Sequence, residues 1–334
     1  MTDPSRESYL LALDIGGTKV AAAVVTQQGQ VVLRQEQPTC QLGPQTGIEQ
    51  MAGMLLEMLE GRGLETSQVL GLGVGIPAVL EAGSDRVIWA PNLQGWRDVD
   101  LRPALESRLG LPVYIEYDGH TAVLGEWWQG AGRGYRSLAV VIIGTGIGGG
   151  MILDGRLYRG RDRLAGAVGW FALTGDPYLP EPRSRSIGHW ESLAAGPGLA
   201  QRAAEQASQH PESGLYPLAQ SQALTARSLF ETARAGDALA KQLVLEAAGL
   251  IGLGVANLVS AIDPEIVILG GSVGAQGDLL LPSVREVVRR WAQPASASST
   301  RIVCSELGAD AGLFGAAYTV LMRGHPSGIS DERS

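Results

Sequence analysis

The feature that most constrains the fold is a strand–turn–strand pattern that occurs twice. The apolar run Leu10–Leu13 leads into a glycine turn at residues 14–19 (DIGGTK), and the apolar run Val20–Val25 follows. In the second half, Leu138–Ile143 leads into residues 144–150 (GTGIGGG) and then into a further apolar stretch. Glycine suits turns that need a positive φ or approach a ligand closely, and stacked N–H groups beside a Thr hydroxyl suit phosphate. Two such turns predict a nucleotide held between two related domains, and hence phosphoryl transfer.

Apolar periodicity along the rest of the chain indicates an α/β protein. The predicted strands span residues 30–33, 69–76, 113–115 and 266–269, and the predicted helices span residues 48–60, 101–109, 121–129, 237–262, 279–291 and 312–322. A chain of 334 residues is long enough for two domains with separate cores. We expect a smaller N-terminal domain of residues 1–118 plus about 310–334, and a larger domain of residues 119–309. Residues 156–188, rich in Arg, Gly and Pro, predict a long functional loop.

Charge and composition argue against several classes of protein. Lys and Arg number 26 against 34 Asp and Glu, a net charge of −8 with no basic stripe, so we expect no nucleic-acid partner. The first eight residues lack the apolar segment of a signal peptide. The longest uncharged apolar stretch, Ala247–Ile262, has 16 residues, fewer than the roughly 20 that span a membrane, and predicts a buried helix. We expect a cytoplasmic protein without a membrane partner.

The glycines of the second turn, Gly144, Gly146 and Gly149, match the residue spacing of a dinucleotide-binding fingerprint. That fingerprint needs a helix directly after the glycines and an acidic residue about 20 positions later. Here a strand and a turn follow instead, and no Walker sequence occurs. Two glycine hairpins without a ligand remain the alternative interpretation.

Six stretches, in this order, resemble the ROK family (repressors, open reading frames and sugar kinases) of the actin-like ATPase superfamily. They are residues 13–19, 90–96, 116–118, 144–149, 153–160 and 263–271. The resemblance extends from about Leu10 to Arg323. It implies an α/β fold of two actin-like (ribonuclease H-like) domains with a cleft between them. Because no helix-turn-helix segment precedes Leu10, we expect the glucokinase-like kinase branch rather than the repressor branch.

The resemblance also implies where ATP and Mg²⁺ bind. The residues expected at the ATP phosphates are Gly16, Gly17, Thr18 and Lys19 on the first turn and Gly144, Thr145 and Gly146 on the second. The turn formed by Gly270, Gly271 and Ser272 would take the adenosine end. Asp14 would hold Mg²⁺ through water, since Mg²⁺ keeps much of its hydration shell. For Lys19, an ordinary solvated lysine is the alternative.

Asp118 is the residue we expect to be catalytic. It follows a predicted strand, at the end of the sheet where ligands bind in open α/β folds. A carboxylate there can accept the proton of a sugar hydroxyl as the oxygen attacks the γ-phosphate. The alternative is an Asp that caps the helix beginning at Thr121.

The sugar-binding residues retained from the family pattern are Asn92 and Glu191, each with a loop-capping or helix-dipole role as the alternative. Elsewhere the chain departs from that pattern. Tyr117 stands in place of an Asn, and residues 167–170 (AVGW) stand in place of Glu-x-Gly-His. The Cys-rich zinc loop is replaced by residues 171–187, which contain no cysteine, and His189 alone cannot supply the three or four ligands that zinc needs. We therefore expect no zinc and a less polar sugar pocket.

Two functions follow from these residues. The first is an ATP-dependent carbohydrate kinase that uses Mg²⁺ and phosphorylates a hexose-like sugar or related polyol. The second is a non-catalytic sensor of sugar or nucleotide on the same fold. The retained phosphate turns and Asp118 favour the kinase. Family members are usually homodimers, so the resemblance implies a homodimer with a small-molecule sugar as substrate.

Overall fold

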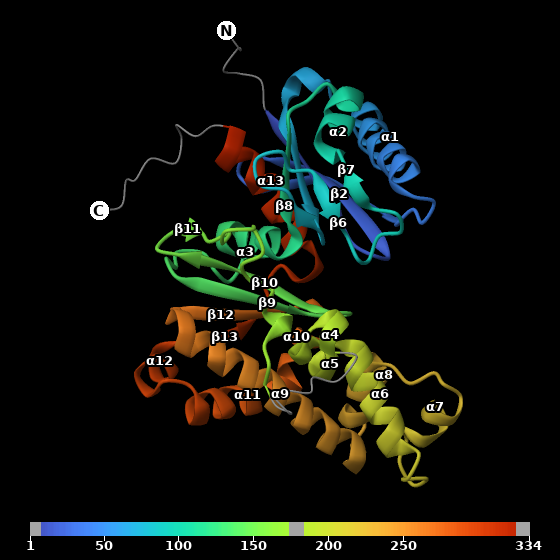
Figure 1. Cartoon of the computed structure of the whole chain (residues 1–334), viewed down its shortest axis with the longest axis vertical. Helices are drawn as coiled ribbons and strands as arrows, with labels where there is room; N and C mark the ends of the chain where they lie inside the picture. The colour runs from blue at the N-terminus through green and yellow to red at the C-terminus, as the bar shows by residue number, and fades with distance from the viewer. Residues whose placement is uncertain (1–7, 174–183, 325–334) are drawn as a thin grey trace. The chain divides into compact units, whose positions relative to one another are not determined.

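The computed structural model describes residues 8–173 and 184–324, and the chain forms two compact units (Figure 1). The first comprises Met1–Gly134, Leu157–Ala165 and Asp310–Ser334, and the second comprises Tyr135–Arg156 and Gly166–Ala309. The division into domains expected at residue 118 stays a prediction. By its contacts, the helix that starts at Asp118 belongs with the first unit, because it packs against the C-terminal helix there.

The sheet of the first unit has five strands in the order β3-β2-β1-β4-β8. The glycine turn joins β1 (Tyr9–Ile15) to β2 (Lys19–Thr26) as an antiparallel hairpin, and β3 (Val31–Pro38) extends it. On the other side of β1, β4 (Val69–Ile76) and then β8 (Val113–Tyr117) pair in parallel. The carboxyl ends of β1, β4 and β8 therefore meet at one edge of the sheet.

Alternation along the strands gives this sheet two apolar faces. Leu11, Leu13 and Ile15 of β1 belong to a core shared with α1 (Pro44–Arg62) and α2 (Leu101–Leu109). Leu10 and Ala12 belong to a second core shared with α13 (Ala311–Gly324). Figure 1 shows α1 and α2 on one side of the sheet and α13 on the other. Asp14 falls on the α13 face, because it alternates with Leu13 and Ile15.

Two helices pack unusually closely on that face. They are α3 (Asp118–Gln129) and α13, and glycines make the approach possible. A Cβ at Gly315 would overlap the carbonyl oxygen of Thr121, and one at Gly125 would overlap that of Ala311. The predicted helices at residues 121–129 and 312–322 are confirmed, and α3 begins three residues earlier than predicted, at Asp118 itself.

The second unit repeats the strand order of the first. Its sheet runs β11-β10-β9-β12-β13, with an antiparallel hairpin followed by two parallel strands. The strands are β9 (Leu138–Ile143), β10 (Ile147–Leu153), β11 (Arg156–Leu157), β12 (Ile266–Gly270) and β13 (Arg301–Cys304). The turn is shorter than the sequence predicted, since β10 already begins at Ile147. Gly149 lies inside that strand, where a Cβ would overlap the carbonyl oxygen of Val140.

Helices dominate the rest of the second unit, as predicted for the chain after Pro197. They are α4 (Ser184–Ile187), α5 (His189–Ala194), α6 (Gly196–Ala207), α7 (Tyr216–Gln220), α8 (Ala226–Arg234), α9 (Ala238–Ile262), α10 (Gly271–Gly274), α11 (Gly277–Trp291) and α12 (Pro294–Ser299). Among the described residues one helix, α9, is long and apolar enough to span a membrane, and 61% of its apolar window is buried. It packs along α11, so it serves as the buried helix that the sequence predicted.

Several short elements complete the chain. A small sheet of β5 (Val79–Leu80), β6 (Val87–Trp89) and β7 (Arg97–Val99) lies where the sequence predicted only a loop. Within the described part of the chain, 3₁₀ turns span Thr66–Gln68, Val168–Trp170 and Gly308–Asp310. The predicted long loop contains β11 and one of these turns over residues 156–173. Its residues 174–183, and the C-terminal tail after Gly324, lie outside the described residues.

Candidate functional site

Two aspartates mark the carboxyl edge of the first sheet. Asp14 pairs in register with Gly75 of β4, which in turn pairs with Glu116 of β8. Asp118 lies two residues beyond Glu116, at the first turn of α3. The two carboxyl groups are near neighbours, since the charge of Asp118 acts directly on Asp14.

Glycine keeps the space around Asp14 open. A Cβ at Gly75 would lie 3.4 Å from Asp14 Oδ1 and 2.7 Å from Thr121 Oγ1 of α3. A Cβ at Gly312, in the first turn of α13, would lie 2.7 Å from Asp14 Oδ2. The N-terminal turns of two helices therefore approach this carboxylate, and the partial positive charge of helix N-termini favours anions there.

Both aspartates titrate well above their ordinary range. Burial, followed by the neighbouring charge of Asp118, raises the pKa of Asp14 to about 7 against a smaller opposing effect of Lys19. Burial raises the pKa of Asp118 to about 6, partly offset by the N–H of Gly119. Two neighbouring carboxylates repel each other when both are ionised, so a bound cation would stabilise them. A carboxylate with a pKa near neutrality is also suited to act as a general base.

Asp118 makes only some of the hydrogen bonds expected of a helix cap. Tyr117, not Asp118, is the N-cap of α3, and it makes no side-chain cap. The N–H of Gly119 donates to Asp118 Oδ1 at 2.8 Å, and Thr121 Oγ1 donates to the carbonyl oxygen of Asp118 at 2.8 Å. These bonds hold the first turn of α3 rigidly, and so they orient the carboxylate.

The first glycine turn is anchored through its carbonyl groups. Thr39 Oγ1 donates to the carbonyl oxygen of Gly16 at 2.7 Å, and Gln41 Nε2 donates to that of Gly17 at 3.1 Å. The predicted sugar ligand Asn92 lies against this turn, since a Cβ at Gly17 would lie 3.1 Å from Asn92 Cβ. Thr18 is exposed. The first unit thus brings this turn, Asn92 and the two aspartates into one region.

Lys19 forms a surface ion pair in this structure. Its Nζ lies 2.9 Å from Glu36 Oε2, and Arg34 bridges the same glutamate to Asp310. This is the solvated role that was the alternative for Lys19, and its phosphate role stays a prediction.

The second unit brings its two predicted nucleotide segments together. The N–H of Gly144 donates to the carbonyl oxygen of Gly146 at 2.9 Å and closes the turn, with Thr145 exposed at its tip. A Cβ at Gly144 would lie 3.7 Å from Ser272 Oγ, so the turn after β12 lies beside the hairpin. Gly271 has a φ of +78°, and a Cβ there would overlap the carbonyl oxygen of Ile143. Only glycine fits that position without strain.

Glu191 is held by the backbone of the second turn. It lies in the first turn of α5, and its Oε2 accepts the N–H of Ile147 at 2.7 Å. A Cβ at Gly146 would lie 2.7 Å from the same oxygen. This bond matches the loop-capping alternative, so the sugar-binding role of Glu191 stays a prediction. His189, on the same helix, accepts the N–H of Leu173 through Nδ1 at 3.1 Å.

Comparison with known proteins identifies the family. A model of the ROK family matches residues 10–323.

The chain belongs to the ROK family. The glucokinase of Halalkalibacterium halodurans is 33% identical over 316 residues, which cover 94% of this chain and 95% of that protein. A ROK family glucokinase from Streptomyces griseus, solved with glucose and AMPPNP, is 31% identical with a TM-score of 0.78, covering 93% of this chain and 98% of that one. The xylose repressor of Caldicellulosiruptor bescii is 28% identical over 302 residues, covering 89% of this chain and 74% of the repressor. The α/β fold of actin-like type predicted from the sequence is thereby confirmed.

Sequence reasoning missed several residues that shape the site of this ROK protein. Gly75 and Thr121 lie beside Asp14, and Asp310 adds a negative charge that raises its pKa. Gly312 was assigned only to a helix. The signal was its place, two residues after Asp310 and at a predicted helix start, where backbone often approaches a ligand.

The donors around Asp14 fit Mg²⁺ better than a protein-caged metal. Among the residues that the structure describes, no three His, Cys, Asp or Glu side chains are placed to hold a metal ion. Mg²⁺ is ordinarily held by one or two carboxylates, with water and substrate phosphates completing its shell. Asp14, with Asp118 beside it, matches that donor set.

Proposed function

We propose that this ROK protein is an ATP-dependent sugar kinase that transfers the γ-phosphate of ATP to a hydroxyl of a hexose-like sugar. The observation that carries the proposal is the pairing of Asp14 and Asp118 at one sheet edge, where burial raises the pKa of both carboxyl groups. Relatives matched over nearly the whole chain include glucokinases. Glucose is therefore the first sugar to test.

In this proposal Asp118 is the general base. Its pKa of about 6 leaves it mostly ionised at neutral pH and still basic enough to take a proton. Its carboxylate accepts the proton of the sugar hydroxyl as that oxygen forms a bond to the γ-phosphorus. The bond between the γ-phosphorus and the β–γ bridging oxygen breaks, and ADP leaves with the electron pair.

The remaining predicted residues bind and orient the substrates. The turns containing Thr18 and Thr145 would bind the ATP phosphates through backbone N–H groups, and the turn containing Ser272 would bind the adenosine end. Asp14 would hold Mg²⁺ through water. When bound, that ion supplies positive charge that stabilises the phosphates during transfer.

The sugar pocket is proposed to be atypical for the family. Asn92 and Glu191 would supply polar contacts, while Tyr117 and Trp170 add aromatic surface; the Trp170 side chain is 58% exposed. Fewer polar partners weaken binding of a sugar with many hydroxyls, since each buried unpaired hydroxyl costs about 1–3 kcal/mol. The proposal includes no zinc, which metal analysis of the purified protein tests. Retained stoichiometric zinc would contradict it.

A sensor without turnover is the second candidate. It is favoured by the bond that occupies Glu191 and by the similarity to a xylose repressor. A sensor would bind sugar or nucleotide, gain thermal stability from either, and release no ADP.

The deciding experiment measures ADP release with Mg-ATP across hexoses, amino sugars, ketoses and polyols. We expect turnover of at least one compound, lost in Asp118→Asn. Silence across the panel, with stabilisation by ATP alone, would instead support the sensor.

Assembly and location complete the proposal. The implied homodimer is tested by light scattering of the purified chain, and a monomer at micromolar concentration would contradict it. A cytoplasmic location is part of the same proposal, and cell fractionation tests it.

A further inference from the structure

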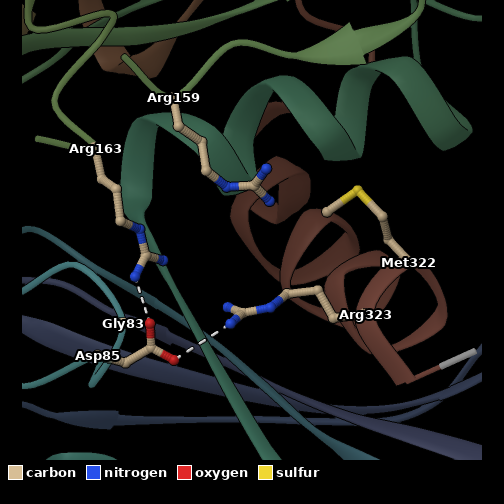
Figure 2. A pocket seen from close by; sticks show the side chains of 6 residues that line it. All are labelled: Gly83, Asp85, Arg159, Arg163, Met322 and Arg323. Carbon is tan, nitrogen blue, oxygen red and sulfur yellow. Dashed lines mark hydrogen bonds and ion pairs between the residues drawn. The ribbon is translucent and has the colours of Figure 1, made fainter. Parts of the chain in front are cut away.

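The first unit contains a polar cavity near the end of α13 opposite to the end that approaches Asp14. It has a volume of about 430 Å³. Its lining residues are Gly83, Asp85, Arg159, Arg163, Met322 and Arg323 (Figure 2). Gly312, which contacts Asp14, lies in the first turn of α13, whereas Arg323 lies in its last. An α-helix rises about 1.5 Å per residue, so about 16 Å of helix separates them. We call this cavity the arginine pocket.

Two buried carboxylates organise the arginine pocket. The side chains of Asp85 and Glu116 are 2% and 0% exposed. Arg163 contacts both and donates through Nη2 to the carbonyl oxygen of Ile115 at 2.7 Å. Arg159 Nη2 donates to Glu116 Oε1 at 2.7 Å. Burial alone would raise the pKa of Glu116, but its contacts with His120 and the arginines outweigh burial and lower the pKa to about 2. Glu116 is therefore ionised at neutral pH.

The backbone of Arg163 is held in a conformation that a non-glycine residue rarely adopts. Its φ is +58°, in the left-handed region. Such a conformation costs about 1–3 kcal/mol and persists where surrounding contacts over-determine it. The ion pairs of its guanidinium with Asp85 and Glu116 supply those contacts, so the floor of the pocket is rigid.

Positive charge exceeds negative charge around the pocket. Arg102 and Arg323 also pair with Asp85, so four guanidinium groups surround two buried carboxylates. Burial lowers the pKa of Arg102 and of Arg323, and Arg163 lowers both further. Glu106 partly offsets this at Arg102, yet the arginines still outnumber the carboxylates. The cluster therefore has positive charge left for an anion.

Arg159 and Arg323 are the two arginines placed to meet a ligand. Their side chains are 32% and 31% exposed, against 10% for Arg163. They come from different elements, the loop after β11 and the end of α13, and both guanidinium groups reach into the same space (Figure 2). Arg159 pairs with Glu116 through Nε and Nη2, while Arg323 pairs with Glu116 through Nη1 and with Asp85 through Nη2. A guanidinium group carries five N–H donors, so the remaining N–H groups of both side chains can donate to the oxygens of a phosphate group.

We propose that the arginine pocket binds the phosphate group of a small organic phosphate monoester between Arg159 and Arg323. A volume of about 430 Å³ exceeds what inorganic phosphate fills and lies in the range of small-molecule sites. Gly83 and the side chain of Met322 provide an uncharged wall for the organic part. The pocket borders the proposed catalytic site, since Glu116 lies two residues before Asp118, but its lining residues are not among the proposed catalytic residues. The inference does not depend on kinase activity.

Calorimetric titration of the full chain tests the proposal, with glycerol 3-phosphate and inorganic phosphate as probes in a chloride buffer. We expect both to bind, the ester more tightly. Arg159→Gln and Arg323→Gln should each weaken binding by about tenfold or more, because a charge-assisted hydrogen bond is lost. Arg234→Gln is the matched control, since Arg234 pairs with Asp278 in the second unit, and it should bind like the wild type.

A separate variant distinguishes this site from the proposed nucleotide site. Lys19→Gln removes a cation from the first glycine turn and should leave glycerol 3-phosphate binding unchanged. Arg323→Lys, which keeps the charge and the pairing with Asp85, serves if Arg323→Gln does not fold. No binding by the wild type, or equal binding by the wild type and both pocket variants, would overturn the proposal. Equal affinity for the two probes would identify free phosphate, rather than an ester, as the ligand.

Discussion

The two units use one backbone plan with different residues at the same place. In the first sheet, Asp14 of β1 pairs in register with Gly75 of β4. In the second sheet, Ile142 of β9 pairs in register with Gly270 of β12. Each position is the second-last residue of the strand that leads into a glycine turn. One copy therefore presents a carboxylate beside its turn, while the other presents an apolar side chain.

This difference shows how a duplicated fold divides its work. Around Asp14 the first unit collects further charge, with Asp118 and Asp310 both raising its pKa. Around Ile142 the second unit has close backbone packing, and a Cβ at Gly270 would lie 2.7 Å from Ile142 Cδ1. We infer that the first unit carries the chemistry and the second unit mainly shapes a nucleotide surface. Four experiments test this difference between the units, and their expected effects decrease in the order given.

Replacing Asp118 should have the largest effect. Asp118→Asn keeps the size of the side chain and removes the proposed base, so kcat should fall by about 10²–10⁴-fold. Steady-state kinetics measures the change. Asp162→Asn is the control, because Asp162 is exposed and pairs with the neighbouring Arg161, and it should retain full activity. A kcat of Asp118→Asn near that of the wild type would remove Asp118 from catalysis.

Replacing Asp14 should separate activity from stability. The pKa of Asp14 in the folded protein, about 7, lies above the ordinary 3.8. Below pH about 4 the carboxyl is protonated in both the folded and the unfolded chain, and the folded state keeps its full stability. That stability is lost as pH rises through 7, because the buried carboxyl must then ionise. Asp14→Asn should therefore raise the melting temperature of the ligand-free protein at pH 8 by a few degrees, with little change at pH 4. Its kcat should fall by about 10²-fold or more, because Mg²⁺ loses its carboxylate.

The equivalent change in the second unit should act in the opposite direction. Ile142→Asp introduces a partly buried carboxylate where the structure collects no such site, so the melting temperature should fall, and more at pH 8 than at pH 4. Thermal unfolding at both pH values measures the pair. If Asp14→Asn destabilised the protein at pH 8, the electrostatic contrast between the units would be wrong.

The third experiment probes the glycine that the second unit needs. Gly271→Ala places a Cβ against the carbonyl oxygen of Ile143 at a φ of +78°, which should cost about 1–3 kcal/mol of stability and weaken ATP binding. Gly53→Ala is the control, since a Cβ there meets open space within α1, and it should be neutral or stabilising by up to about 1 kcal/mol. Chemical denaturation and nucleotide titration provide the readouts, and equal stability of the two variants would contradict the packing argument.

The smallest effect is expected from pH. With saturating Mg-ATP the bound cation should keep Asp14 ionised, which leaves Asp118, with a pKa of about 6, to set the profile. We expect kcat/KM to be level at pH 7–8 and to fall about tenfold for each unit well below pH 6. A pH–rate profile with saturating Mg-ATP measures this. A profile that stays level down to pH 4.5 would mean that no group with this pKa must be ionised.

Local patterns determined much of the fold. The two strand–turn–strand units and the buried helix at residues 247–262 could be predicted because periodicity and glycine placement act over a few residues. The ROK resemblance followed from short motifs in a fixed order, and the family comparison confirms it. Boundaries were less certain: β10 begins inside the predicted turn and α3 begins at Asp118, since strand pairing and helix packing extended both.

Contacts between distant segments belonged to the tertiary structure alone. No local pattern predicts that Arg159 and Arg163, in a predicted loop, meet Glu116 more than 40 residues away. Nor does the sequence show that Gly312 approaches Asp14, because that contact depends on how closely α13 packs on the sheet. The repeated strand–turn–strand units, the family and the identity of the aspartates follow from local sequence patterns. The tertiary structure decided their pKa values and charged neighbours, because desolvation and ion pairing depend on which segments fold against one another.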